Sequence, residues 1–162
     1  MDQREKDRLL HNLRSLPNEL EDLLSDLDEG ILRWRPIPHK WSIKEIMCHL
    51  RDMERLAYLA RYKKILAEDN PLLENVDQDK LAHETDYINQ DAQAALADFK
   101  TLRAETIETL AAAPVEAWSR LGILQTAGAM TLEQIVRERQ INGNDINHLN
   151  QMKDIVRLKM PW

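Results

Sequence analysis

The sequence has few of the residues that form crosslinks, tight turns and membrane spans. Its 162 residues include a single cysteine, Cys48, so no disulfide can form within the chain. Four glycines and six prolines are too few for a chain built from many turns, and they favour a few long helices. No run of about 18 apolar residues is present, so no segment is expected to span a membrane.

The chain also lacks an excess of positive charge. It carries 22 lysines and arginines against 28 acidic residues, and a net charge of -6 argues against a nucleic-acid binder that relies on phosphate contacts. Residues 1–10 are charged and lack the apolar core of a signal peptide, so we expect a cytoplasmic protein. The length predicts one domain over residues 1–162.

The first segment with helical periodicity extends from Leu9 to Ile31. Its leucines recur at steps of three and four residues, as expected of an amphipathic helix. Pro17 interrupts this segment, and it predicts either a kink or a new first turn capped by Ser15. Gly30 predicts the end of the helix.

Two further helices are predicted from capping boxes. Ser42-Ile-Lys-Glu45 and Thr131-Leu-Glu-Gln134 each place a hydroxyl before the helix and a long polar side chain three residues later. The first box opens a helix with apolar residues from Ile43 onward, and the second opens the last helix of the chain. We therefore expect these helices to begin directly after the hydroxyl residues.

The middle of the chain predicts one more helix between two irregular segments. Residues 71–83 are acidic and polar without a period and are predicted to form a loop, and Glu84–Ala113 is predicted to be helical up to Pro114. Val115–Gly128 is predicted to be a structured connection with a short turn of helix. No segment shows the alternation typical of a strand, so the sequence predicts an all-α four-helix bundle.

Two histidines border the apolar faces of the predicted helices. His49 follows Ile46 by three residues, and His148 precedes Met152 by four. A neutral imidazole is the commonest transition-metal ligand, so the pair is a candidate metal site inside the bundle. The alternative is that both are hydrogen-bonded core residues without a ligand.

Carboxylates lie near both histidines in the sequence. Asp52 follows His49 by three residues, and Asp145 precedes His148 by three. Either carboxylate is a candidate to orient an imidazole, and the alternative for each is a solvated surface charge. Glu54 is expected to face another side and to pair with a basic residue of the first helix.

The remaining chemically active residues give weaker expectations. Cys48 is expected to be a small packing residue, because it is rotated by about 100° from its neighbour on the helix. Arg137 and Arg139 offer positive charge to an anionic ligand, although exposed arginines on a helix usually bind nothing specific. Three histidines are expected to be exposed and without a functional role: His11, His39 and His83.

Taken together, these residues resemble the DinB/YfiT-like superfamily of four-helix bundles over nearly the whole chain. Each motif is short, and it is their order and separation that carry the resemblance. The motifs are Trp34-Arg35-Pro36, Lys40–Ile46 followed by His49-Leu50, Ala117-Trp118, Met130-Thr131-Leu132 and Asn144-Asp145-x-x-His148-Leu149-x-Gln151.

The resemblance implies a divalent metal held by three histidines, one on the second helix and a His-x-x-x-His pair on the last. The matching positions are His49, Asn144 and His148, so an amide stands where the family has an imidazole. Three arrangements follow. Asp145 or Asp52 substitutes as the third ligand, the Asn144 carbonyl oxygen serves as a weak hard ligand, or the pocket holds no metal.

The resemblance also implies two classes of function. The first is a small-molecule transferase or hydrolase that depends on zinc, nickel, iron or manganese, since characterised relatives include thiol transferases and a thiol-dependent isomerase. The second is a non-catalytic DinB-like module that binds a ligand or a partner after losing its metal. Related bundles often pair, so the resemblance implies a homodimer.

Overall fold

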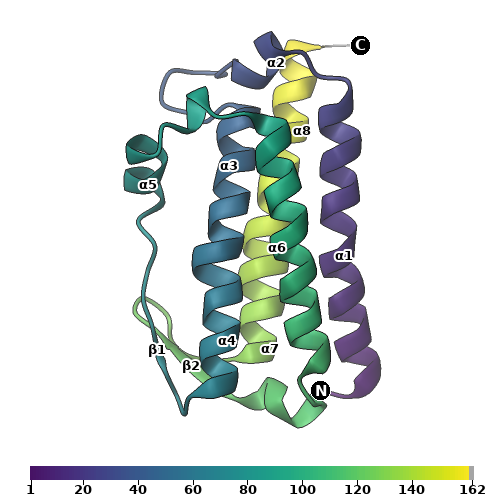
Figure 1. Ribbon diagram of the computed structural model, residues 1–162, viewed down its shortest axis with the longest axis vertical. Helices are drawn as coiled ribbons and strands as arrows, with labels where there is room; N and C mark the ends of the chain where they lie inside the picture. The colour runs from purple at the N-terminus through teal and green to yellow at the C-terminus, as the bar shows by residue number, and fades with distance from the viewer. Residues whose placement is uncertain (161–162) are drawn as a thin grey trace.

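The computed structural model describes residues 1–160, in which four long helices lie side by side in one bundle (Figure 1). This confirms the predicted fold class. The first long helix is α1 (Gln3–Ser25), and the third is α6 (Ala92–Ala112). The second consists of α3 (Ile43–Met53), the π-helical segment η1 (Glu54–Leu59) and α4 (Ala60–Ala67). The last consists of α7 (Leu132–Gln134), the π-helical segment η4 (Ile135–Ile146) and α8 (Asn147–Lys159).

The order of the helices around the bundle differs from their order in the sequence. Helix α6 packs against α1 on one side and α3 on the other, while the last helix packs against the same two. The first and second long helices are therefore diagonal to each other, and short α2 (Glu29–Arg33) with the connector after it joins them across one end (Figure 1). This arrangement makes the second and last helices direct neighbours.

The first helix is not broken at its proline. Helix α1 continues through Pro17, so the predicted new first turn with a Ser15 cap is wrong, and Gly30 lies inside α2 rather than ending α1. Pro17 has no backbone N–H to donate to the carbonyl four residues earlier, that of Leu13. Arg103 of α6 donates from Nη1 to this Leu13 oxygen at 3.0 Å, so the carbonyl that the proline leaves free has another partner.

Both predicted capping boxes are confirmed. The Ser42 hydroxyl accepts from the backbone N–H of Glu45 at 3.2 Å, and the Glu45 carboxylate accepts from the Ser42 N–H at 3.1 Å. Thr131 and Gln134 make the same reciprocal pair at the start of α7. The sequence motif therefore places the start of the two helices that carry the histidines.

The segment between the second and third helices is more ordered than predicted. Instead of a loop it contains strand β1 (Leu72–Leu73), helix α5 (Gln78–Glu84) and the 3-10 turn η2 (Tyr87–Asn89). Helix α6 does not begin at Glu84, because Asp91 caps it by accepting hydrogen bonds from backbone amides of its first turn.

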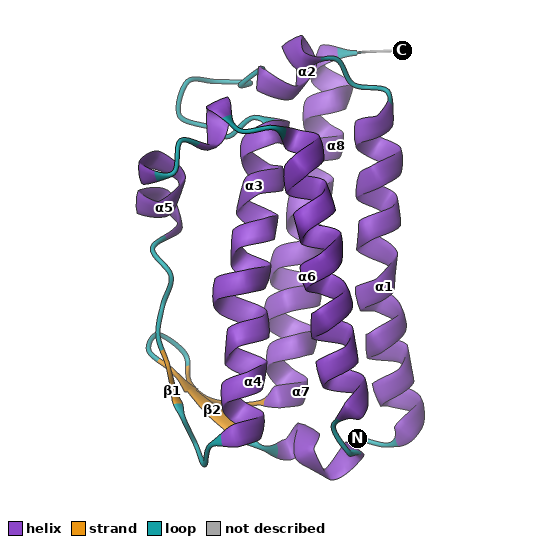
Figure 2. Cartoon of the chain, in the orientation of Figure 1, coloured by secondary structure: helices purple, strands orange, loops and turns teal. Residues whose placement is uncertain are grey.

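A small sheet lies beside α4 near one end of the bundle (Figure 2). After the 3-10 helix η3 (Val115–Ser119), which fits the predicted helical turn, come β2 (Leu121–Leu124) and β3 (Gly128–Thr131). The sheet order is β1-β2-β3, with β1 parallel to β2 and β3 antiparallel to it, so the expectation of no strands is wrong. Gly122 allows close packing here, because an added Cβ would lie 2.5 Å from Cδ1 of Leu73.

The apolar core consists of two groups of side chains that follow one another along the bundle. One group is centred on residues such as Leu24 and Phe99, and the other on residues such as Tyr62 and Trp118. Charged residues that are fully buried, including Arg103, lie where the two groups meet. No helix within residues 1–160 is both long and apolar enough to cross a membrane.

Candidate functional site

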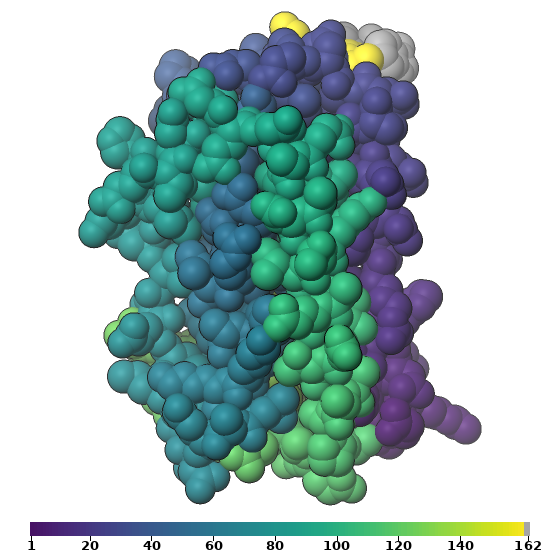
Figure 3. Space-filling view, viewed as in Figure 1, coloured from purple at the N-terminus to yellow at the C-terminus, as the bar shows by residue number. Residues whose placement is uncertain are grey.

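The structure brings the three family positions together at one cavity. His49 of α3, Asn144 of η4 and His148 of α8 all line a cavity of about 460 Å³. The two imidazole centroids are 4.5 Å apart, and the rings are inclined by 68°. A cavity of this size accommodates a small molecule. In the space-filling view the outline of the protein is indented between α5 and the sheet, the segments that flank the cavity (Figure 3).

Both histidines are neutral at physiological pH. Burial, reinforced by the neighbouring His148 ring, lowers the pKa of His49 to about 3, and only 2% of His49 is exposed. Burial also lowers the pKa of His148. Each imidazole therefore keeps one nitrogen lone pair free to bind a metal or to accept a hydrogen bond.

Neighbouring polar side chains orient His148, Asn144 and His49. Nδ1 of His148 lies 3.1 Å from Oε1 of Gln151, so this nitrogen donates and Nε2 keeps the lone pair. Nδ2 of Asn144 donates to Oδ1 of Asp145 at 3.2 Å, and this bond turns the Asn144 oxygen away from Asp145. A hydrogen bond with Asn144 partly offsets the lowered pKa of His49, as expected when the oxygen faces the imidazole.

An indole covers the histidines on one side. The Trp41 ring centroid lies 4.8 Å from that of His49 and 6.5 Å from that of His148. Trp41 directly precedes the Ser42 cap, so the motif that starts α3 also fixes the indole beside the imidazoles. The ring limits the access of water to the histidines from this side.

Neither predicted substitute carboxylate joins the histidines. Asp145 accepts two hydrogen bonds from Arg103 at 2.9 and 3.0 Å, while Asp52 accepts from Arg51 at 2.8 Å and from the Tyr87 hydroxyl at 2.8 Å. Within residues 1–160, no three side chains among histidine, cysteine, aspartate and glutamate converge on a metal-sized site. Asp145 orients Asn144 rather than an imidazole.

Glu54 corrects another expectation. It is fully buried and pairs with Arg103 of α6, at 3.0 and 2.9 Å, rather than with the first helix. Gln140 donates to Glu54 at 2.9 Å and accepts from the Tyr62 hydroxyl at 2.7 Å. We call Glu54, Tyr62, Arg103, Gln140 and Asp145 the Arg103 network.

The Arg103 network was missed although the sequence holds a signal for it. Arg103 follows Phe99 by four residues and precedes Leu110 by seven, so a charged side chain lies on the apolar stripe of α6. An arginine on such a stripe requires buried carboxylate partners. Glu54 and Asp145 meet this requirement.

The other end of the cavity is basic. Arg61 of α4 and Arg139 of η4 line it, and the Tyr58 hydroxyl donates to the backbone oxygen of Arg139 at 3.0 Å. Arg139 was a candidate from the sequence, whereas Arg61 was not. Gly143 also lines the cavity, and a Cβ there would lie 3.0 Å from the Glu138 carbonyl oxygen, so the wide turn of η4 explains this glycine.

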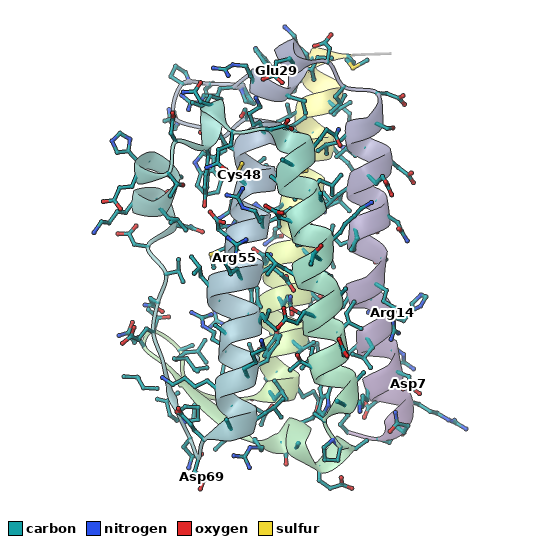
Figure 4. All side chains as sticks on the ribbon, in the orientation of Figure 1. Asp7, Arg14, Glu29, Cys48, Arg55 and Asp69 are labelled. Atoms are coloured by element: carbon teal, nitrogen blue, oxygen red, sulfur yellow. The ribbon has the colours of Figure 1, made fainter. Side chains whose placement is uncertain are left out.

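The structure confirms the expected burial of Cys48 and the expected exposure of three histidines. Cys48 is fully buried against the segment of Tyr87 and Gln90, and burial raises the pKa of its thiol to about 11, so it is an inert packing residue. Figure 4 labels Cys48 and Arg55 along the second long helix. His11, His39 and His83 are exposed.

A family model matches most of the chain, and curated relatives match about half of it. A family model described as the DinB superfamily matches residues 12–152. A relative from Bacillus licheniformis, named "Putative metal-dependent hydrolase", is 29% identical over 101 residues, which cover 62% of this chain and 57% of the relative. A Bacillus mycoides protein with the same description is 28% identical over 76 residues, 47% of this chain and 43% of its own. The matches therefore span about half the length of these curated relatives.

A solved structure shares the whole fold. YfiT from Bacillus subtilis, described as "a probable metal-dependent hydrolase with an unusual four-helix bundle topology", superposes with a TM-score of 0.89. The superposition covers 100% of this chain and 91% of YfiT at 20% sequence identity. The diagonal placement of the first two long helices is thus part of a known bundle architecture.

Proposed function

The chain belongs to the DinB superfamily, and we propose that it is a metal-dependent hydrolase of a small molecule, with a divalent cation at His49, His148 and Asn144. The observation that carries this proposal is the convergence of these three side chains on one cavity. The names of the relatives from Bacillus licheniformis and Bacillus mycoides support the reaction class.

The residues present fit a weakly held cation. Two neutral imidazoles and one amide oxygen supply three uncharged donors, and the lone pair on Nε2 of His148 is left free by the bond to Gln151. Three protein donors leave coordination positions open for water and substrate. Because the amide oxygen is a hard ligand, this set favours manganese or iron over zinc.

The protein itself would supply orientation and a partly dry site. When bound, the cation lowers the pKa of a water molecule and polarises a carbonyl or phosphoryl group. Gln151 holds the His148 ring, Asp145 holds the Asn144 amide, and Trp41 shields the imidazoles. These residues lie at the start of α3, in the π-helical segment η4 and in the first turns of α8 rather than on long loops.

A thiol transferase is the related reaction that the same site permits. Among residues 1–160, the one cysteine, Cys48, is too deeply buried to take part in thiol chemistry. We therefore place hydrolysis first. The cytoplasmic location and the homodimer stay predictions.

The second candidate function is a metal-free binding module. The observation that favours it is that both nearby carboxylates are committed elsewhere, Asp145 to Arg103 and Asp52 to Arg51. In that case the His49 and His148 lone pairs would accept hydrogen bonds from the ligand. Metal binding separates the two functions.

Equilibrium dialysis of the untagged protein against manganese, iron, nickel and zinc tests the proposal. We expect about one equivalent of at least one metal, by the two-imidazole donor set. We expect its loss in His49→Ala and in His148→Ala, and no change in the control His11→Ala, whose imidazole is exposed. Binding of less than about one tenth of an equivalent of every metal would favour the metal-free module.

Asn144→His is the matched gain-of-function variant. It completes the three-histidine set on the same helix and should tighten binding about tenfold or more. If this variant also binds no metal, the assignment of the three positions itself is wrong.

A further inference from the structure

Among the arginines of the bundle that are at least partly buried, Arg61 differs from the others because it does not pair with a carboxylate. Five arginines within residues 1–160 are at least partly buried, and four of them pair with a carboxylate. These four pairs are Arg51–Asp52, Arg103–Glu54, Arg120–Asp69 and Arg137–Glu133. The fifth, Arg61, has no carboxylate partner among the described residues.

The Arg61 guanidinium is held in place but incompletely satisfied. Its Nη2 donates to the backbone oxygen of Glu74 at 2.9 Å, which fixes the side chain against the chain that leads to α5. Its Nε is buried and has no hydrogen-bond partner within residues 1–160. A cation in this state is costly unless a negative charge from outside the protein approaches it.

A second arginine adds to the positive charge at the same end of the cavity. Arg139 lines the cavity, and its guanidinium makes no ion pair with any residue that the structure describes. It lies near enough to reinforce the lowering of the Arg61 pKa that burial causes. No aspartate or glutamate lines this cavity, although the chain as a whole carries a net charge of -6. The positive charge is therefore a local property of the cavity.

Apolar side chains line the same cavity as the arginines and the histidines. Met53, Val76 and Leu124 line the cavity together with His49 and His148. A ligand with a charged group at one end and an apolar body would match both the arginines and this lining. A polymer such as nucleic acid fits poorly, because the basic groups face a cavity rather than form an exposed stripe.

We propose that the cavity binds a small organic anion, whose carboxylate or phosphate group lies against Arg61 and Arg139 and whose apolar body extends toward His49 and His148. This rests on the proposed function in one respect, namely that the anion is the substrate or product of the hydrolase. Binding itself requires only the two arginines, which form charge-assisted hydrogen bonds with planar or tetrahedral oxyanions.

Calorimetry on metal-free protein of residues 1–162 tests the proposal with three small aromatic probes. Benzoate and phenyl phosphate carry the two oxyanions, and benzamide is the neutral counterpart. We expect one or both anions to bind at least about tenfold more tightly than benzamide, and the tighter anion identifies the headgroup. Equal affinities for all three probes would overturn the proposal.

Two variants and one control assign the binding to the arginines. Arg61→Gln and Arg139→Gln should each weaken the preferred anion about tenfold and leave benzamide binding unchanged. Arg137→Gln is the control, since this residue lies on the same π-helical segment as Arg139, pairs with Glu133 and does not line the cavity. Unchanged anion affinity in both cavity variants, or an equal loss in the control, would contradict the proposal.

Metal dialysis of the same variants separates this inference from the proposed function. If the wild type binds the anion through the arginines but takes up no metal, the hydrolase proposal fails and the anion site stands. If Arg61→Gln takes up metal like the wild type and the anions show no preference, the anion site fails and the metal site stands.

Discussion

The bundle contains two clusters of polar side chains, the Arg103 network and the polar residues that line the cavity. Two adjacent residues of η4 belong one to each cluster. Asp145 is part of the Arg103 network, whereas Asn144 faces the cavity of His49 and His148. In the network every charged group has a partner from another helix. In the cavity, by contrast, the buried Nε of Arg61 has no hydrogen-bond partner within the described residues.

The difference separates the part of the bundle that maintains the fold from the part available for binding. Buried charges that satisfy one another leave no bonding capacity for a ligand. Buried or half-buried polar groups without partners destabilise the fold slightly and gain most from a ligand. Mutations in the first cluster should therefore change stability, and mutations in the second should change binding.

The largest expected effect comes from removing the centre of the network. Arg103→Met leaves Glu54 and Asp145 buried without their cation, and we expect the free energy of unfolding to fall by about 3–5 kcal/mol. Urea unfolding followed by circular dichroism measures this. The control Arg137→Gln removes a partly exposed pair and should change it by less than about 1 kcal/mol. Similar losses of stability in Arg103→Met and Arg137→Gln would contradict the structural role of the Arg103 network.

An intermediate effect is expected at the edge of the network. Tyr62→Phe removes the hydroxyl that donates to Gln140 and leaves a buried carbonyl oxygen without that donor. The expected loss is about 1–3 kcal/mol. An unchanged free energy of unfolding would show that Gln140 does not need the hydrogen bond from Tyr62.

Tyr62 also gives the bundle a pH dependence in the alkaline range. Burial raises the pKa of Tyr62 well above its ordinary value, so the native state keeps a proton that the unfolded chain releases. This stabilisation is complete below the unfolded pKa of about 10 and is lost as the pH rises further. Tyrosinate absorbance near 295 nm should stay low in native protein at pH 11 and rise on unfolding, since burial also raises the pKa of Tyr58 and Tyr87. Tyrosinate in the native state at pH 11 would contradict this.

The smallest effect on stability is expected in the cavity. His148→Ala removes a half-buried imidazole whose hydrogen bond is to Gln151, and metal-free protein should lose less than about 1 kcal/mol. Thermal unfolding with and without metal measures this. A loss above about 2 kcal/mol in the metal-free protein would identify His148 as a structural residue rather than a ligand.

Sequence patterns predicted the long helices well because periodicity and capping are local. Ser42 and Thr131 mark helix starts that the structure confirms, since the donors and acceptors of each box lie within four residues. The start of α6 was misplaced because Asp91 as a cap looks like any acidic residue in an acidic segment. Strands of two to four residues, such as β1 and β2, are too short to show alternation.

The candidate site was predictable only in part, for a similar reason. His49, Asn144 and His148 could be placed by family resemblance and helix spacing. The partners of Asp145 and Glu54 depend on which helices are diagonal, and that is a property of the tertiary fold. Asp145 is three residues from His148 in the sequence, but it pairs with Arg103 because α6 lies opposite this part of the last helix.

Pro17 has a consequence for how the helices slide against one another. The carbonyl that it frees, that of Leu13, accepts from Arg103, which is anchored by residues of the second and last helices. A shift of α1 by one residue along its axis would move this oxygen by about 1.5 Å and leave Arg103 one acceptor short. Leucines alone would tolerate several axial positions of α1, and the proline selects one of them.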